Sequence, residues 1–401
     1  MKSNGIIVQS GGPTAVINNS VIGIIDEMKY SGFQGEIYGS VGGILGLINE
    51  SFIELGNLSV RDRIRLRWTP GAALGTCRYK LTFDEVEVII KNLKKHSIHF
   101  LFYIGGNGSM QVAKMIHDTA AIMKYDLAVI GIPKSIDNDL LGTDHSPGYG
   151  SAAKFLATSI LDMKMDVASY PETNQLTIIE TMGRHTGWLA AACSLTVSDR
   201  EDSQTLIYIP EVPFCLTSCI EKVVNAHENK RNTFLITAEG LKNSAGQYIN
   251  HDELEYDTLN RPKLGGVSTY LKEIIEAKTG IRTRAIETSI LQRSSILLAS
   301  KTDVDEAYEI GRESWKYALK GYSGVMIAME RANHQDTDYK MMYRPKLLKE
   351  VAGKEKYFPV EWYDKKNNIM TDEFIRYVEP LIQGEMMIPI ENGLPVYKQV
   401  I

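Results

Sequence analysis

The chain has 401 residues, of which 44% are hydrophobic and 23% charged, and its formal net charge is −5. This length allows two or three domains with cores of ordinary size. Charges of both signs are interspersed, so no polybasic run indicates a nucleic-acid or membrane partner, and no apolar stretch is long enough to span a bilayer. We expect no signal peptide and, because four cysteines are too few for a disulfide framework, a reducing cytoplasmic location.

The first predicted unit is a strand, a glycine turn and a helix. Residues 5–8 form a short apolar strand, Gly11 and Gly12 follow, and residues 15–25 show the apolar spacing of a helix. This geometry presents backbone N–H groups and a helix N-terminus to a phosphate. The spacing matches neither the dinucleotide fingerprint nor the Walker A loop, so an ordinary strand–helix turn is an equally good interpretation.

The loop at residues 69–80 carries Arg78 and Tyr79 among small residues, and residues 84–95 predict an amphipathic helix after it. Small residues let a ligand approach the backbone closely. A solvated loop with an incidental arginine is the alternative.

A second strand–glycine–helix unit follows. Residues 100–104 predict a buried strand, residues 105–109 read Gly-Gly-Asn-Gly-Ser, and a helix is expected from residue 110 to about 123. Two such units in one chain make phosphate binding a stronger hypothesis than either unit alone.

The segment after the next strand carries the most chemistry. Residues 127–132 predict a buried strand, and Lys134, Ser135, Asp137 and Asp139 come directly after it. Two carboxylates at the end of a buried strand are costly unless they meet a cation, a metal or a proton donor. Ligands bind at the carboxyl ends of strands in open α/β sheets, so we predict the catalytic centre here.

The alternation of strands and helices continues through the second half of the chain. Further strands are predicted at residues 176–180, 205–209, 234–240, 282–287 and 324–329, and further helices at 147–167, 265–278, 303–320, 338–351 and 371–382. Arg184 is expected at a helix N-terminus, where the helix dipole disfavours a cation unless an anionic ligand lies between them. The pattern predicts an α/β fold with two doubly wound, Rossmann-like domains, mostly parallel sheets, an active site in the cleft between them and a C-terminal helical extension.

Five motifs together resemble those of the phosphofructokinases in order and spacing. They are Ser10-Gly11-Gly12, the segments 105–109 and 133–139, Met182-Gly183-Arg184 and Gln292-Arg293. The resemblance implies Mg²⁺-dependent transfer of a phosphoryl group to the 1-hydroxyl of fructose 6-phosphate, which gives fructose 1,6-bisphosphate in glycolysis. It also implies a donor-phosphate domain at residues 1–147, completed by about 300–330, a sugar-phosphate domain at 148–299, and an extension at 331–401.

The resemblance assigns roles to individual residues. Asp137 would be the base that takes the proton of the attacking hydroxyl, and the other catalytic residues would be Lys134, Gly108 and Arg184. The donor site would be lined by Gly12, Arg78, Tyr79, Gly106, Asn107 and Ser109. The sugar phosphate and the transferred group would be held by Ser135, Asp139, Met182, Gly183, Glu239, Arg284 and Arg293. Mg²⁺ would be held by Asn107 and Asp139. Arg284 matches an arginine that a neighbouring subunit supplies, so the resemblance implies a homo-oligomer, either a dimer or a tetramer.

The donor is ambiguous in this pattern. Pyrophosphate-using relatives usually carry Asp at the position of Gly108, where its charge repels the α-phosphate of a nucleotide, so Gly108 favours ATP slightly. Asn107 replaces the Asp of ATP-using relatives and is a weaker Mg²⁺ ligand, which favours pyrophosphate as the alternative. Residues 75–81 and the C-terminal extension also resemble the pyrophosphate-using branch.

The acceptor site departs from the family as well. Ile290 stands where relatives have His or Tyr, and Gln175 where they usually have a basic residue. These changes suggest another ketose phosphate, such as sedoheptulose 7-phosphate, or a catalytically weak regulatory subunit that binds sugar phosphate. A dinucleotide-dependent oxidoreductase is disfavoured, because no Gly-x-Gly-x-x-Gly follows a strand with an acid about 20 residues later.

Overall fold

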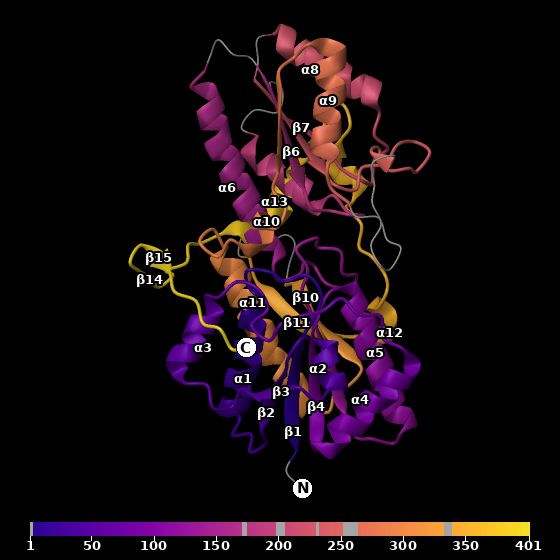
Figure 1. The fold of residues 1–401 in the computed structure, drawn as a ribbon, viewed down its shortest axis with the longest axis vertical. Helices are drawn as coiled ribbons and strands as arrows, with labels where there is room; N and C mark the ends of the chain where they lie inside the picture. The colour runs from indigo at the N-terminus through magenta and orange to yellow at the C-terminus, as the bar shows by residue number, and fades with distance from the viewer. Residues whose placement is uncertain (1–2, 171–174, 198–204, 230–231, 252–263, 333–338) are drawn as a thin grey trace. The chain divides into compact units, whose positions relative to one another are not determined.

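Parallel strands and helices alternate along the chain, as the sequence predicts, and they form two separate units in the computed structural model (Figure 1). The structure describes residues 3–170, 175–197, 205–229, 232–251, 264–332 and 339–401. Unit 1 comprises residues 1–151, 293–356 and 382–401, and unit 2 comprises residues 152–292 and 357–381. Residues 331–401 therefore do not form a unit of their own but are divided between the two.

Unit 1 is built on a seven-stranded sheet with the order β11-β10-β5-β4-β1-β2-β3. Its strands are β1 (Asn4–Gln9), β2 (Ile37–Ser40), β3 (Phe52–Glu54), β4 (Ile98–Gly105), β5 (Ala128–Pro133), β10 (Val325–Arg331) and β11 (Met341–Leu347). Only the edge strands β3 and β11 pair in antiparallel fashion. The carboxyl ends of β1, β4 and β5 consequently lie side by side at one edge of the sheet.

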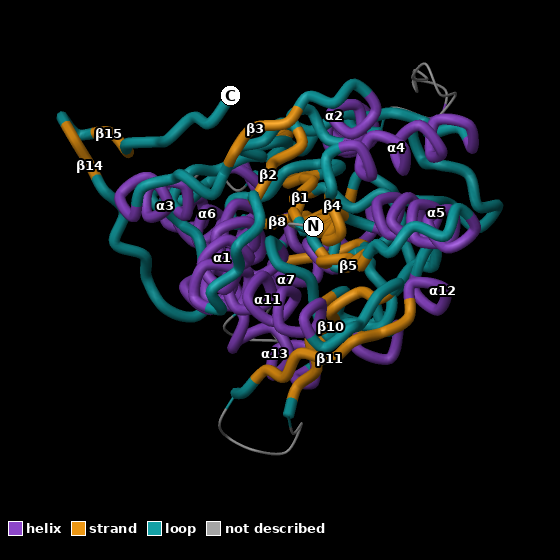
Figure 2. Tube along the Cα trace, turned by 90° about the horizontal axis from the view of Figure 1, so that it is seen from below, coloured by secondary structure: helices purple, strands orange, loops and turns teal. Residues whose placement is uncertain are grey.

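Helices cover both faces of this sheet, because its strands are apolar on both sides. Ile6 and Val8 of β1 pack against one set of helices and Ile7 packs against the other. The first set is α2 (Ile44–Ile48), α4 (Phe83–Lys95), α5 (Asn107–Ile122) and α12 (Leu348–Val351), and the second is α1 (Ile17–Tyr30), α3 (Val60–Arg67) and α11 (Lys301–Leu319). Figure 2 shows the two layers on either side of the sheet.

Unit 2 contains a parallel four-stranded sheet with the order β7-β8-β6-β9. Its strands are β6 (Leu176–Thr181), β7 (Thr205–Tyr208), β8 (Thr233–Ala238) and β9 (Thr283–Glu287), and its helices include α7 (Trp188–Ala192), α8 (Leu216–Glu228) and α9 (Val267–Thr279). Helix α6 (Tyr149–Ala168) begins in unit 1 and continues into unit 2, and α10 (Leu291–Ser294) spans the second boundary. Helices α8 and α9 pack on one face of the sheet.

The C-terminal segment of unit 2 is fixed by aromatic packing. The ring of Trp188 lies within 5.1–6.5 Å of the rings of Phe358, Trp362, Phe374 and Tyr377, measured between centroids. These residues lie on or near η3 (Val360–Trp362) and α13 (Asp372–Val378), and η4 (Glu379–Ile382) follows. The predicted helix at residues 371–382 is confirmed as α13 and η4.

The predicted helix at residues 338–351 is wrong. Residue 338 lies outside the described residues, Met341–Leu347 form the strand β11, and only Leu348–Val351 are helical. Pro345 cannot donate to a helical hydrogen bond, whereas an edge strand tolerates it, and β11 pairs with β10 along seven residues. The strand at residues 324–329 is therefore not the last strand of the chain.

The remaining elements are short. Strands β12 (Tyr363–Asp364) and β13 (Ile369–Met370) form one two-stranded ribbon, and β14 (Ile390–Glu391) and β15 (Leu394–Pro395) form another. All four cysteines are free thiols. Within the described residues, no helix combines the length and the apolar character that a membrane crossing requires.

Candidate active site

Three of the predicted segments meet at the carboxyl ends of β1, β4 and β5. The Nζ atom of Lys134 donates a 2.6 Å hydrogen bond to the main-chain oxygen of Gly12, and the backbone N–H of Lys134 donates to Gly105 at 3.1 Å. The strand order places β4 between β1 and β5, so Lys134 links the segments on both of its neighbours. The expected convergence of the two glycine segments with the Lys134–Asp139 segment is therefore present in unit 1.

Arg293 joins this group from a distant part of the sequence. A Cβ atom built on Gly12 would lie 2.8 Å from Nη1 of Arg293, and one on Gly11 would lie 3.4 Å from Nζ of Lys134. Any larger residue at position 12 would push the guanidinium away. The turn thus brings backbone and two cationic groups together without an intervening side chain, which suits a multiply charged anion.

The electrostatics of Lys134 agree with an anion site. Its side chain is buried, and burial lowers the pKa of Lys134 to about 8, although the carboxylates of Asp139 and Asp137 act in the opposite direction. The nearby Arg293 adds to the lowering. An anionic ligand would oppose both effects and favour the charged ammonium.

The second glycine segment is the start of a helix rather than a loop before it. Helix α5 begins at Asn107, so Asn107, Gly108 and Ser109 form its first turn, with Gly106 at the N-cap. The first N–H groups of a helix lack intrahelical partners and attract anions. A Cβ atom on Gly108 would meet no atom within 4 Å, so this turn faces open space at that position.

The acidic segment is held by hydrogen bonds that involve Ser135 and Asn107. The hydroxyl of Ser135 donates to Oδ1 of Asp139 at 2.7 Å and accepts from the backbone N–H of Asp137 at 3.2 Å. The amide nitrogen of Asn107 donates to Oδ2 and to the main-chain oxygen of Asp139, at 3.3 and 3.1 Å. Asp139 therefore has a fixed orientation, and Asp137 lies in the same turn.

These residues are compatible with a magnesium ion. Oδ1 of Asn107 is buried and has no hydrogen-bond partner within the described residues, and it lies on the amide that contacts Asp139. No group of three or more His, Cys, Asp or Glu in the described part of the chain could hold a metal. Mg²⁺ bound to phosphates commonly takes only one or two carboxylates from the protein, so Asp139 with Asn107 fits this pattern.

The loop at residues 69–80 is fixed by buried amides that the sequence analysis missed. Asn18 accepts from the backbone of Ala73, Gln9 accepts from that of Leu74, and the two side chains bond each other at 2.8 Å. The hydroxyl of Thr76 then donates to the main-chain oxygen of Gly11 at 2.9 Å. The signal was present, because three polar residues, Asn18, Asn19 and Ser20, interrupt the apolar helical run.

The two residues of this loop that the sequence singled out point elsewhere. Arg78 and Tyr79 are exposed, and the hydroxyl of Tyr79 donates to the carboxylate of Glu85 on α4. The structure places Thr76, and not Tyr79, beside the glycine turn. The assignment of Arg78 and Tyr79 to the donor site remains a prediction.

A second group forms in unit 2 at the carboxyl ends of β6 and β8. The backbone N–H of Gly183 donates to Oε1 of Glu239 at 3.4 Å, and that of Met182 donates to Oε1 of Gln292 at 3.2 Å. Gly183 has a φ of +141°, and a Cβ atom there would lie 2.5 Å from the oxygen of Thr186. The sharp turn therefore requires glycine.

Arg184 is not at a helix N-terminus, so that prediction is wrong. Helix α7 begins only at Trp188, and Arg184 lies in the preceding bend. The carboxylate of Glu211 accepts from the N–H of Gly187 at 3.1 Å and holds the chain outside the helix up to that residue. The helix-dipole argument for an anion at Arg184 therefore does not apply. Arg184 still directly follows Gly183, which belongs to the group of residues around Glu239.

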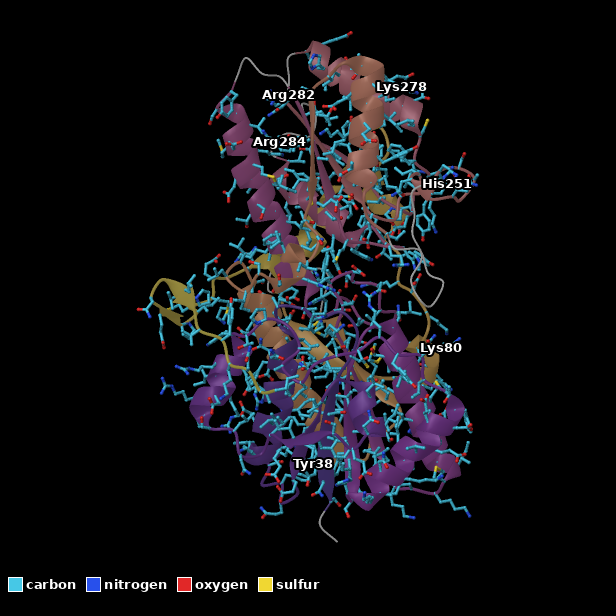
Figure 3. All side chains as sticks on the ribbon, viewed as in Figure 1. Tyr38, Lys80, His251, Lys278, Arg282 and Arg284 are labelled. Carbon is cyan, nitrogen blue, oxygen red and sulfur yellow. The ribbon has the colours of Figure 1, made fainter. Side chains whose placement is uncertain are left out.

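The predicted sugar-phosphate residues do not all come together. Arg284 pairs with Thr177 near the amino end of β6, and Gln175 lies just before that strand, whereas Met182 and Gly183 follow its carboxyl end. A rise of about 3.3 Å per residue separates the two groups by about 16 Å. Figure 3 labels Arg284 on β9. Its side chain is half-exposed, and its Nη1 atom lies 3.9 Å from Oδ2 of Asp166 of α6.

Two further residues of the family pattern stand three positions apart in the chain, on either side of the boundary between the two units. Arg293 belongs to unit 1, and Ile290 follows the carboxyl end of β9 in unit 2 with 57% of its surface exposed. The sites thus divide into an anion site with two acids in unit 1 and a glycine–glutamate site in unit 2. Paired cations, a helix N-terminus and neighbouring carboxylates define a protein that handles phosphate groups.

Comparison with known proteins identifies the class. The phosphofructokinase family model matches residues 4–311. The chain is 35% identical over 399 residues to the pyrophosphate–fructose 6-phosphate 1-phosphotransferase of Halomonas elongata, covering 98% of this chain and 94% of that protein. It is 33% identical over 362 residues to the sulfofructose kinase of Alkalicoccus urumqiensis, covering 90% and 92%.

The fold agrees with these sequences. The crystal structure of the pyrophosphate-dependent phosphofructokinase of Nitrosospira multiformis matches with a TM-score of 0.90 and 33% identity, covering 100% of this chain and 96% of that one. The chain belongs to the phosphofructokinase family, and it is a phosphotransferase.

Proposed function

We propose that this protein transfers a phosphoryl group from pyrophosphate to the 1-hydroxyl of fructose 6-phosphate with the help of Mg²⁺. The observation that carries this proposal is the group in unit 1 in which Lys134 contacts Gly12 while Asp137 and Asp139 close the same segment. The names of the similar proteins support pyrophosphate as donor. These names support pyrophosphate better than they support ATP, the donor that Gly108 favours in the sequence analysis.

The chain's own residues supply most of what this reaction needs. Phosphoryl transfer depends on in-line placement and on neutralising charge at the transferred group. Lys134 and the first turn of α5 would hold the donor phosphates. Arg293, which the family resemblance assigns to the sugar phosphate, lies beside Gly12 and would instead act with them. Asp137 would accept the proton of the 1-hydroxyl as it attacks, and Ser135 would keep the turn that carries it in place.

Mg²⁺ would be held by Asp139 and Asn107. When bound, the ion would supply positive charge that neutralises the negative charge of the donor phosphates. Because the carboxylate of Asp139 already accepts from Ser135 and Asn107, its orientation is set before any ion arrives. This arrangement reduces the reorganisation that binding requires.

Arg284 would act on a neighbouring subunit. Arg284 lies beside the amino end of β6, whereas Met182 follows its carboxyl end, so the two residues of one chain cannot bind the same phosphate. A second copy of the chain would supply the missing arginine, so we propose a homo-oligomer.

A second candidate differs in donor and acceptor. The open space at Gly108 would admit the α-phosphate of ATP. Gln175 lies at the same end of β6 as Arg284 and would act with it on a neighbouring subunit. It is neutral where the family pattern has a basic residue, and a sulfonate carries less negative charge than a phosphate. The similarity to a sulfofructose kinase therefore supports sulfofructose as an alternative acceptor.

A two-by-two assay tests these proposals. Purified protein with Mg²⁺ is offered pyrophosphate or ATP, each with fructose 6-phosphate or sulfofructose. The product, fructose 1,6-bisphosphate or sulfofructose 1-phosphate, is quantified. We expect the highest kcat/KM with pyrophosphate and fructose 6-phosphate. A higher value with ATP or with sulfofructose would replace the corresponding part of the proposal, and no turnover in any combination would refute it.

A further inference from the structure

Lys356 contacts the acidic segment from a part of the chain to which the sequence assigned no role. Its ammonium donates to the main-chain oxygen of Asp144 at 2.6 Å, to Oδ1 of Asn138 at 3.1 Å and to the main-chain oxygen of Thr143 at 3.3 Å. Three acceptors thus surround an ammonium that carries three donors. Lys356 thereby ties the Asn138–Asp144 segment together at one point.

The backbone around Lys356 reinforces this contact. Its N–H donates to the main-chain oxygen of Asp139 at 2.8 Å, and Glu355 forms an antiparallel bridge with Leu140. Residues 355–356 therefore run alongside residues 139–140. Main chain and side chain of Lys356 hold two consecutive residues, Asn138 and Asp139.

Asn138 is the residue that needs such support. It has a φ of +53°, a left-handed conformation that is unfavourable for most residues with a Cβ atom and that Asn adopts more readily when its side chain is hydrogen-bonded locally. Its side-chain oxygen accepts both from Lys356 and from the backbone N–H of Ser146, at 3.1 Å each. Because Asn138 stands between Asp137 and Asp139, its backbone angles set the directions in which the two carboxylates leave the chain.

The acceptors of Lys356 are themselves fixed. Asp144 bonds Nδ1 of His145 at 2.8 Å, and Nε2 of that ring bonds Glu306 of α11 at 2.7 Å. The carboxylate of Asp144 also lies 3.3 Å from the guanidinium of Arg331. This network anchors the far end of the segment to α11 and β10, so Lys356 connects the acidic turn to a rigid part of unit 1.

We propose that Lys356 is a positioning residue for phosphoryl transfer. It fixes the left-handed turn at Asn138 and so orients Asp137 and Asp139, without touching the substrates itself. This inference rests on the proposed function of those two acids. Residues that orient reacting groups typically change rate by about 10- to 100-fold when they are removed.

The first test compares Lys356→Met with Lys354→Met, a control at an exposed lysine two positions away. Methionine keeps the length and apolar character of the lysine stem and removes its donors. We expect Lys356→Met to lower kcat at least tenfold while KM for the sugar phosphate stays within twofold, and Lys354→Met to match the wild type. An unchanged kcat, or a loss of stability with kcat retained, would overturn the proposal.

The second test asks whether Lys356 acts through Asn138. Asn138→Gly tolerates the left-handed backbone but removes the side-chain acceptor. The double variant combines Lys356→Met with Asn138→Gly. If Lys356 acts through the side chain of Asn138, kcat of the double variant lies within twofold of that of the slower single variant. A loss in kcat equal to the product of the two single losses would contradict the proposal. Should Lys356→Met fail to fold, Asn138→Gly decides alone: a tenfold lower kcat at normal KM is expected, and wild-type kcat would overturn it.

A readout without turnover separates this inference from the proposed function. Backbone amides of residues 134–141 should exchange with deuterium at least tenfold faster in Lys356→Met than in the wild type and in Lys354→Met. Unchanged exchange would refute the positioning role. If the wild type transfers no phosphoryl group but exchange accelerates as expected, the contact is confirmed and the proposed function is the part that fails.

Discussion

The Nζ atom of Lys134 lies 2.6 Å from the main-chain oxygen of Gly12, a residue 122 positions earlier in the chain. This hydrogen bond joins the glycine turn after β1 to the acidic segment after β5. It also brings the ammonium next to Arg293, whose guanidinium lies against Gly12. Two cations thus lie beside the glycine turn, and the chemistry of this group can be tested one residue at a time.

Lys134 should give the reaction an alkaline limit. Burial lowers its pKa to about 8, and only the protonated form attracts an anionic donor. We expect kcat/KM for pyrophosphate to fall about tenfold per pH unit above pH 8, since this parameter reports the free enzyme. The control is Lys134→Arg, whose guanidinium stays charged in this pH range. We expect this variant to be slower overall but to show no fall in kcat/KM above pH 8. A flat wild-type profile up to pH 9.5 would contradict the assignment.

Asp137 should be needed for turnover and not for binding. Replacing a general base typically costs about 10²- to 10⁴-fold in rate. We therefore expect Asp137→Asn to lose at least 10²-fold in kcat while fructose 6-phosphate binds within threefold of the wild type by calorimetry. Asp126→Asn, at an exposed position just before β5, is the matched control and should be fully active. Near-normal kcat in Asp137→Asn would exclude it as the base.

Gly108 should control the choice of donor. Its Cβ position is open, and an acid in the first turn of a helix is favourable, so Gly108→Asp should fold normally. We expect this variant to lose at least tenfold in any ATP-dependent kcat/KM and to keep the pyrophosphate-dependent one within threefold. Gly108→Asn has nearly the size of Gly108→Asp without its charge, so its ATP-dependent kcat/KM should lie between those of Gly108→Asp and the wild type. Undiminished ATP use in Gly108→Asp would show that this position does not discriminate donors.

His145 should make stability depend on pH. Burial opposes its protonation, but the carboxylates of Glu306 and Asp144 outweigh this and raise the pKa of His145 to about 9. The folded pKa lies above the ordinary value of about 6.5, so the stabilisation is complete below pH 6.5 and disappears as the pH rises through 9.

The comparison with His145→Gln isolates this effect. Between pH 6.5 and 9.5, the difference in unfolding free energy between wild type and variant should shrink by about 3 kcal/mol. Urea unfolding followed by circular dichroism at several pH values measures it. Titrating groups outside the network of His145, Asp144, Glu306 and Lys356 are present in both proteins and cancel. A difference that does not change with pH would mean that His145 is neutral in the folded protein.

Ile290 should influence the acceptor. It is 57% exposed beyond β9, so substitution there should cost little stability. We expect Ile290→His, which restores a residue of the family pattern, to raise kcat/KM for fructose 6-phosphate at least threefold relative to sulfofructose. Ile290→Gln provides a neutral control. Equal changes for both acceptors would show that this position does not read the group at C6.

Local patterns in the sequence were sufficient for most elements. Apolar runs of four to eight residues become buried strands, and apolar side chains at helical spacing become helices, because both depend on neighbours along the chain. The glycine turn at Gly12 and the acids at Asp137 and Asp139 follow their strands as predicted. The strand β11 was missed because its pairing with β10 outweighs the helical spacing of its side chains.

Tertiary structure decided which residues meet. The order β5-β4-β1 and the parallel direction of these strands bring Lys134 to Gly12. In the sheet of unit 2, the parallel register of β6 and β9 separates Arg284 from Met182, although the motifs suggested one site. Lys356 reaches Asn138 across 218 residues, and no local pattern marks it. Sequence thus determined the elements and the chemistry at their ends, whereas strand order and register determined which of those ends act together, because contacts between distant residues depend on packing that no short stretch encodes.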